Sequence, residues 1–328
     1  MQPLRLHSPG TFHSIQSFDA QEHASHFSEW EENRYNHLRP QSAFHGVIDM
    51  HQALPQAQIT RETIHSHNCM EQLSQVASGS VVLVNVESTS EVLINGRYVR
   101  DSFFHISSGV PFHVIAMGAV QGIIISMDKD FFFEQFASYG YRAKALHAFE
   151  RFINPSRIMR QEFADCSERH FSQLQSSDTT KEAEQASFAR IMGCVGDVLE
   201  FETAVAQAPL ARSTRAYIVE KSCELFSQKL HDEEYGILDL CHELRISRRT
   251  LQYSFESVLH MGASAYFRSV RLNYARQLLK TSPDAHIRNT ALRAGFNHPG
   301  RFSQYYLDFY GELPSVTIER AQRPAGLS

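Results

Sequence analysis

Apolar residues in the last third of the chain recur at the spacing of short helices. A first set falls at i, i+3, i+4 and i+7, which places its members on one face of a helix. These residues are Ile237, Leu240, Cys241 and Leu244. The pattern breaks at Arg245 and Ile246, and Ser247 is a residue type that commonly caps the start of a helix. The stretch therefore predicts two helices joined by a tight turn.

The second of these helices has one apolar and one polar face. Its predicted buried residues are Leu251, Phe255, Val258 and Leu259. Long hydrogen-bonding side chains stand near its start: Arg248, Arg249, Gln252 and Tyr253. Such side chains at the leading end of a helix reach base edges in the major groove of DNA, so we identify these four as candidate base contacts. Taken alone, the pattern is equally typical of a solvated, charged helix face.

Residues 287–310 repeat this layout. Gly295 suits the left-handed position of a turn, and Asn297 is a suitable cap for a following helix that has Pro299 in its first turn. The apolar residues of that helix keep the i, i+4, i+8 spacing of the first copy and are Phe302, Tyr306 and Tyr310. Candidate DNA contacts on this second reading helix are Arg301, Ser303 and Gln304.

A longer helix is predicted between the two copies, from Ser264 to Lys280. Its inward-facing residues by pattern are Tyr266, Val270, Ala275, Leu278 and Leu279. Its arginines are predicted to point outward, and Arg268 and Arg271 are candidate phosphate contacts, which position a protein on DNA without reading its sequence. A helix of this length spans about 25 Å. Such a spacer can hold two reading helices about one DNA turn, ~34 Å, apart.

Several short motifs follow one another in the order and spacing of a bacterial regulator family. They are Ser247-Arg248-Arg249-Thr250-Leu251, Arg271-Leu272-Asn273, Ala275-Arg276-Gln277-Leu278-Leu279, Ala294-Gly295-Phe296 and Gly311-Glu312-Leu313-Pro314-Ser315. On these motifs, residues 212–320 resemble the tandem helix-turn-helix domain of the AraC/XylS transcription regulators. Leu240-Cys241 and residues 248–255 are further similar to the branch of that family that contains ethanolamine-operon regulators.

The resemblance implies a transcription regulator that binds double-stranded DNA through both helix-turn-helix units. It also implies a small-molecule effector sensed by the N-terminal domain, a homodimer, and RNA polymerase as a partner if the protein is an activator. One departure concerns the second reading helix. Pro299 and Gly300 stand where family members often carry amide or basic side chains, so we expect base reading to fall mainly on the first unit.

The charge distribution agrees with a division into two domains. Residues 206–328 carry 16 Lys and Arg against 12 Asp and Glu, a net charge of +4, whereas residues 1–205 carry 15 against 24, a net charge of −9. A mildly basic half fits a DNA-binding domain. We predict a sensor or dimerisation domain at 1–206, a linker at 207–214 containing Pro209, and an all-α DNA-binding domain at 215–328.

The N-terminal domain is predicted to be α+β, with a small β-barrel or sheet plus helices. Short β-rich runs lie at 81–84 and 91–94, Asn95-Gly96 is a hairpin signal, and 97–106 is predicted to be the returning strand. Residues 109–127 are nearly all apolar, and their glycines, proline and β-branched residues favour two strands joined near Met117-Gly118 over a membrane helix.

Helical spacing follows after Asp130. Candidate helices are 131–152, with a break at Gly140, then 159–174 and 183–205. The last has an apolar stripe that is typical either of a domain core or of a dimer seam, formed by Phe188, Ile191, Val195, Val198 and Val205. Near the N-terminus, residues 25–36 are polar and are predicted to be a short helix or a loop anchored by Trp30.

Histidines near residue 70 raise an alternative function. His65, His67 and Glu71, with His105 or His113, follow the ligand order of cupin metal enzymes, so a cupin-type metal-dependent enzyme with a helical appendage is the competing hypothesis. The tandem repeat and the many other histidines favour the regulator, for which we expect no catalysis, cofactor or metal. The five cysteines lack metal-ligand spacing and, with no evident signal peptide, indicate free thiols in a cytoplasmic protein.

Overall fold

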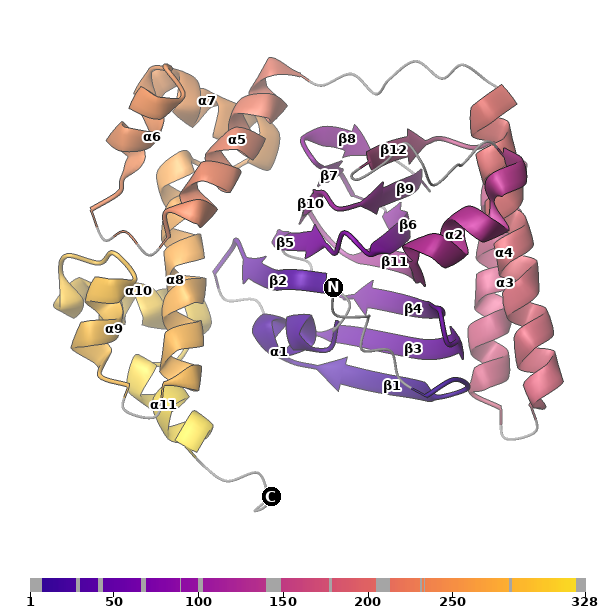
Figure 1. The fold of residues 1–328 in the computed structure, drawn as a ribbon. Coiled ribbons are helices and arrows are strands. Elements are labelled where there is room, and N and C mark those ends of the chain that lie inside the picture. The colour runs from indigo at the N-terminus through magenta and orange to yellow at the C-terminus, as the bar shows by residue number, and fades with distance from the viewer. Residues whose placement is uncertain are drawn as a thin grey trace.

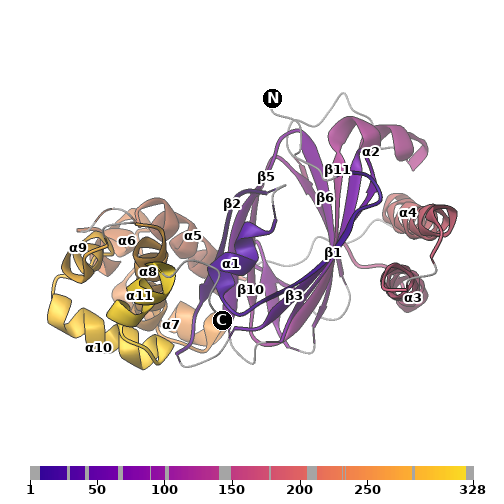
Figure 2. The ribbon, with the colours of Figure 1, turned by 90° about the horizontal axis from the view of Figure 1, so that it is seen from below.

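The computed structural model describes residues 8–27, 30–40, 44–65, 69–88, 90–99, 103–139, 149–176, 179–204, 213–230, 232, 234–282 and 285–322. Within these residues, two β-sheets lie in the N-terminal part and a group of helices forms the C-terminal part (Figure 1). Four layers follow one another in Figure 2: the C-terminal helices, the five-stranded sheet, the seven-stranded sheet, and a pair of long helices.

Both sheets are antiparallel. The seven-stranded sheet has the order β1 (Phe12–Ser17), β3 (Gly46–Leu54), β4 (Ala57–Ile64), β11 (Val120–Asp128), β6 (Ser80–Ser88), β9 (Phe103–Ser108) and β12 (Phe149–Ile153). The five-stranded sheet has the order β2 (Trp30–His37), β5 (Met70–Val76), β10 (Pro111–Ala116), β7 (Val92–Ile94) and β8 (Arg97–Val99). The predicted barrel or sheet is therefore an open sandwich of two sheets.

Alternation along β6 shows how the sandwich buries its residues. Val82, Val84 and Val86 belong to the apolar cluster between the two sheets. Val81 and Leu83 belong to a second cluster, on the face of the seven-stranded sheet that packs against helices. Because neighbouring side chains of a strand point to opposite faces, one run of valines and leucine supplies both cores.

Helices cover the outer face of the seven-stranded sheet. They are α2 (Lys129–Gln135), the 3-10 turn η1 (Ala137–Tyr139), α3 (Arg157–Leu174) and α4 (Lys181–Ala204), while α1 (Ala20–Ser25) lies beside β2. The apolar stripe of α4 is buried against this sheet through Phe188, Ile191, Val195 and Val198. Those side chains are core residues and are not available as a dimer seam, and Val205 lies outside the described residues.

Two N-terminal predictions are confirmed. The chain turns at Asn95 and Gly96, both with positive φ, between β7 and β8. Residues 111–116 and 120–128 are separate strands, β10 and β11, joined through Met117 and Gly118. Among the described residues no helix is long and apolar enough to cross a membrane.

Three other predictions are wrong. Residues 30–37 form the strand β2, which pairs with β5. Its polar side chains pack at a sheet face that other elements cover. The predicted strand 97–106 is divided, with β8 in one sheet and β9 in the other. The end of the predicted helix 131–152 is the strand β12, whose pairing with β9 overrides the helical spacing of its phenylalanines; residues 140–148 lie outside the described residues.

The C-terminal part consists of helices, as predicted. They are α5 (Thr214–Gln228), α6 (Ile237–Glu243), α7 (Arg248–Leu259), α8 (Ala263–Thr281), α9 (Ile287–Arg293), α10 (Pro299–Tyr310) and α11 (Pro314–Gln322). α6 with α7, and α9 with α10, are the two helix-turn-helix units, and α8 connects them (Figure 1). α11, which was not predicted, packs against α8.

Local sequence explains the two turns. Ser247 caps α7, since its Oγ accepts a hydrogen bond from the Thr250 N–H at 3.0 Å. Gly295 has a φ of +76°, as predicted, and Arg245 adopts the corresponding left-handed conformation in the first unit with a φ of 53°. The predicted cap Asn297 is displaced by one residue: His298 is the N-cap of α10, without a side-chain capping bond, and Pro299 occupies the first turn.

Candidate DNA-binding surface and the interface behind it

The leading end of α7 presents the predicted polar side chains to solvent. Arg248, Arg249 and Tyr253 are exposed, and Gln252 is half-buried. The Gln252 amide donates a hydrogen bond to Glu256 Oε1 at 2.7 Å. Behind them, Leu251, Phe255, Val258 and Leu259 are buried as predicted. The helix is thus fixed by its apolar face and offers two guanidinium groups, an amide and a phenol on the other.

The exposed face of α10 is less rich in donors at its start. Pro299 and Gly300 contribute none, and Arg301 is the first exposed cationic side chain. Gln304 is exposed and donates to Asp308 Oδ1 at 2.7 Å, while Ser303 is half-buried. Phe302 and Tyr306 are buried and hold the helix in place.

The arginines of α8 have different environments. Arg268 is exposed, and its guanidinium lies 4.6 Å from the centre of the Tyr305 ring. Arg271 instead donates to the backbone oxygens of Gly295 at 2.7 Å and Tyr235 at 2.6 Å. A Cβ on Gly295 would lie 2.6 Å from Arg271 Cζ, so a larger residue there would have to displace the guanidinium. We assign Arg271 a structural role between the two units and retain only Arg268 as a candidate phosphate contact.

A stripe of polar residues on α8 faces the N-terminal region. Asn273 Nδ2 donates to the backbone oxygen of His37 at 2.8 Å, and its Oδ1 accepts from the His37 N–H at 3.1 Å. Ser269 donates to the backbone oxygen of Leu38 at 3.1 Å. Further along the helix, Arg276 and Lys280 both contact Asp19, at 3.2 and 2.7 Å. The predicted outward position of Arg276 is therefore wrong, because this side of α8 is an interface.

Apolar residues complete that interface. One continuous cluster contains Leu93 and Ile115 of the five-stranded sheet and Leu38, directly after β2, together with Val219 of α5 and Tyr266 of α8. The reading helices and the sheet are therefore connected through α8 and α5. The sequence offered one sign of this second contact: Ser269 and Asn273 are polar residues on buried positions of an otherwise apolar helix face.

Glu71 lies at the centre of the same interface and is completely buried. Its carboxylate accepts hydrogen bonds from His113 Nε2 at 2.9 Å, from Asn36 Nδ2 at 2.8 Å and from the Tyr266 hydroxyl. Burial alone would raise the pKa of the Glu71 carboxyl, but these donors outweigh it and hold the pKa below its ordinary value. The buried carboxylate is thus charged and bonded to both regions.

Within the described residues, the candidate ligands of the cupin hypothesis do not come together as one group. Glu71 does meet His113, but the His65 ring stacks on His45, with the ring centres 4.8 Å apart. His105 contacts Glu150 at 3.0 Å, and His67 lies outside the described residues. All five cysteines are free thiols, as predicted.

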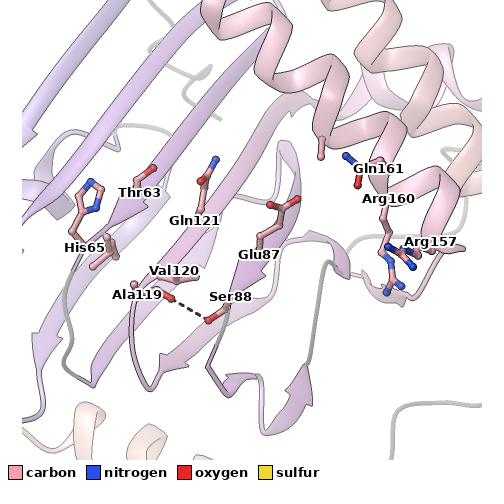
Figure 3. Close-up of a pocket in the computed structure, with 12 residues that line it drawn as sticks. Thr63, His65, Glu87, Ser88, Ala119, Val120, Gln121, Arg157, Arg160 and Gln161 are labelled. Carbon is pink, nitrogen blue, oxygen red and sulfur yellow. Dashed lines mark hydrogen bonds between the residues drawn. The ribbon is translucent and has the colours of Figure 1, made fainter.

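An open cleft of about 700 Å³ lies between the seven-stranded sheet and the start of α3 (Figure 3). Gln121 and Glu87 project from the sheet, and Arg157 and Arg160 stand on the first turn of α3 across from them. His65 lines the far end of this cleft. Charged side chains of both signs, Glu87 against Arg157 and Arg160, stand on walls that also have apolar surface.

Comparisons with known proteins agree with the tandem units. A family profile described as a helix-turn-helix domain matches residues 240–320. The chain is 31% identical over 112 residues to the HTH-type transcriptional regulator ExsA of Pseudomonas aeruginosa, and 37% identical over 78 residues to the XylDLEGF operon transcriptional activator 1 of Pseudomonas putida. These segments are 33% and 23% of this chain, and they span only 40% and 23% of the two relatives.

Among solved structures, the AraC-like transcriptional activator CuxR is aligned over 87% of this chain and 100% of its own, at 17% identity and a TM-score of 0.39. The matched profile and the two regulators carry the assignment, since both fall on the tandem units described above. The C-terminal region of this chain is an AraC/XylS-type helix-turn-helix domain.

Proposed function

We propose that the protein is a sequence-specific DNA-binding transcription regulator whose N-terminal region responds to a small-molecule effector. The observation that carries this proposal is the pair of exposed, donor-bearing helix faces on α7 and α10, held together by α8. Double-stranded DNA is the partner that such a pair suits, because each helix can enter the major groove.

The proposed contacts differ between the two units. Arg248, Arg249, Gln252 and Tyr253 read bases, since long donors at a helix start reach base edges. Arg268 and Arg301 contact phosphates, with Ser303 and Gln304 beside them on α10. We further propose residues 1–206 as the sensor domain, 207–214 as the linker and 215–328 as the DNA-binding domain.

The cleft in Figure 3 is our proposed effector site. Arg157 and Arg160 at the helix start favour a small anionic molecule. Effector binding would act on α8 through the sheets, because His37 and Leu38 at the end of β2 and Asp19 at the start of α1 bind the polar stripe of α8. Homodimer formation and contact with RNA polymerase belong to the same proposal, as in a transcription activator.

Two experiments test the proposal. Selection of bound DNA from a random library should enrich one motif with two half-sites about one helical turn apart; binding without enrichment would indicate an architectural DNA-binding protein instead. Thermal-shift screening with anionic metabolites should find a stabilising compound. That stabilisation should be lost in an Arg157→Ala/Arg160→Ala variant and kept in Arg169→Ala, an exposed arginine on α3 that does not line the cleft.

A further inference from the structure

Three potential metal ligands meet inside the interface between the sheets and the helices. A carboxylate oxygen of Glu71 on β5, an imidazole nitrogen of His113 on β10 and the thiol sulfur of Cys223 on α5 all lie within 4.8 Å of one another. All three residues are buried. Two belong to the N-terminal sheet and one to the DNA-binding region, so the group exists only when the regions are docked.

The chemistry of these donors matches one class of metal ion. Thiolate, imidazole and carboxylate are the side chains that bind Zn²⁺, at about 2.3, 2.0–2.1 and 2.0–2.2 Å. Donors placed around one ion at these distances lie about 3–4 Å apart, so closing the group needs only small shifts. The Tyr266 hydroxyl, which already contacts Glu71, lies close enough to serve as a fourth ligand through its oxygen. Mg²⁺ and Ca²⁺ prefer all-oxygen sites and do not suit a thiol.

We propose that Glu71, His113 and Cys223 form a binding site for a Zn²⁺-like divalent ion that joins the N-terminal sheet to α5 of the DNA-binding region. The ion would bind the docked arrangement and not the separated one, so it would stabilise docking by the free energy of its own binding. It would serve a structural role, because its ligands are enclosed by both regions.

A route from solvent to this group exists. His113 also forms part of the wall of a cleft of about 410 Å³ between the five-stranded sheet and α5. Carboxylates and cationic groups both line that cleft: Glu32, Glu150, Glu220 and Glu224 against Arg34, Arg97 and Lys221. A small ion that enters this polar cleft meets His113, the one ligand of the group that lines it.

Binding of the metal ion releases one proton to solvent. Burial raises the pKa of the Cys223 thiol well above its ordinary value, so without metal the group is a neutral S–H. The ion takes the place of that proton, which passes to solvent. His113 shifts its remaining proton from Nε2 to Nδ1 and offers the Nε2 lone pair to the ion. Glu71 exchanges its hydrogen bond from His113 for a bond to the metal.

Cobalt(II) is the probe for the test, because it reports thiolate ligation by a charge-transfer absorption band. The metal-free full-length protein, kept reduced, is titrated with Co²⁺ and then with Zn²⁺. We expect one equivalent of Co²⁺ to bind with a thiolate band, and Zn²⁺ to displace it. A wild-type titration without such a band, or one without a one-to-one end point, overturns the proposal, and this result does not depend on any variant folding.

Variants assign the ligands. Cys223→Ser should abolish the thiolate band and lower Zn²⁺ affinity by more than the roughly 10–100-fold that loss of an outer-shell partner costs. His113→Gln should lower the affinity in the same way but keep a sulfur band at higher Co²⁺. The control is Cys241→Ser, a buried thiol of the same region that lies outside the group. If Cys241→Ser loses the band and Cys223→Ser keeps it, the assignment is wrong. Because no DNA is present, the outcome is independent of the proposed regulatory function.

Discussion

Asn273 holds the backbone of His37 from both sides, with Nδ2 donating to the His37 carbonyl oxygen at 2.8 Å and Oδ1 accepting from the His37 N–H at 3.1 Å. Asn273 stands near the middle of α8, between the two helix-turn-helix units, and His37 ends β2 of the five-stranded sheet. The Asn273 side chain thus bonds to the His37 backbone as a neighbouring strand would. This contact attaches the N-terminal region to α8, the helix that lies between the two reading helices.

Loss of this contact should destabilise the whole protein. Asn273→Ala removes both of its hydrogen bonds to the buried His37 backbone, which costs about 1–3 kcal/mol. We expect the free energy of unfolding in urea to fall by that amount. Asn289→Ala, at an exposed position on α9, is the matched control and should leave it nearly unchanged. Equal effects of the two substitutions would mean that the α8 contact does not hold the regions together.

Substitutions of Arg271 and Arg268 should affect two different properties, the stability of the protein and its affinity for DNA. Arg271→Ala removes two charged hydrogen bonds to the backbone of Tyr235 and Gly295, and we expect a loss of stability on the order of 2–3 kcal/mol. Arg268→Ala removes only an exposed contact with the Tyr305 ring, worth about 0.5–1 kcal/mol, but it should weaken DNA binding. Calorimetric melting and binding titrations on both variants check this pair. A stable Arg271→Ala protein would contradict the structural role.

The N-terminal core should be sensitive to mild acid. His51 Nδ1 and His170 Nε2 lie 3.1 Å apart, and burial lowers the pKa of His51 to about 4 and that of His170 to about 3, from an ordinary 6.5. The carboxylate of Glu184, 3.9 Å from His51, does not offset this. Below pH 6.5 the unfolded chain takes up protons that the folded protein refuses, so stability is lost as the pH falls from 6.5 towards 4.

The measurement is the unfolding free energy against pH for the wild type and His170→Gln, which keeps polar contacts but cannot titrate. Each histidine contributes a slope of about 1.4 kcal/mol per pH unit in that window. The variant should therefore lose less stability per pH unit than the wild type, by about one histidine. Carboxyl groups that titrate in the same range affect both proteins alike. Parallel curves would show that His170 does not resist protonation.

The sequence predicted the C-terminal region well because its signals are local. Ser247, Gly295 and the three-and-four spacing of Leu251 and Phe255 each act within one or two turns of chain. The strand β2 was missed since its polar residues gain partners from elements that are distant in sequence, among them β4, β5 and α5. The buried group of Glu71, His113 and Cys223 could not be predicted for the same reason. The sequence made His113 a candidate ligand, but no local signal near Cys223 indicates that α5 packs against this sheet.

The two reading helices should divide the work of recognition. Gln252→Ala removes an amide near the start of α7 and should cost about 1–3 kcal/mol on the preferred site, with relaxed preference at one or two bases. Arg301→Ala removes the first exposed cation of α10, after Pro299 and Gly300, which have no donors in their side chains. It should weaken binding to all DNA sequences alike. The slope of the logarithm of the binding constant against the logarithm of the salt concentration should become shallower by about one unit.

The most direct measurement is binding of the wild type, Gln252→Ala and Arg301→Ala to a library of site variants at several salt concentrations. Arg169→Ala, on α3 at the far side of the sheets, controls for net charge (Figure 2). We predict that Gln252→Ala changes the base preference and leaves the salt slope intact, while Arg301→Ala lowers the slope and leaves the preference intact. If Arg301→Ala alters the preference and Gln252→Ala does not, α10 is the base-reading helix and the account is contradicted.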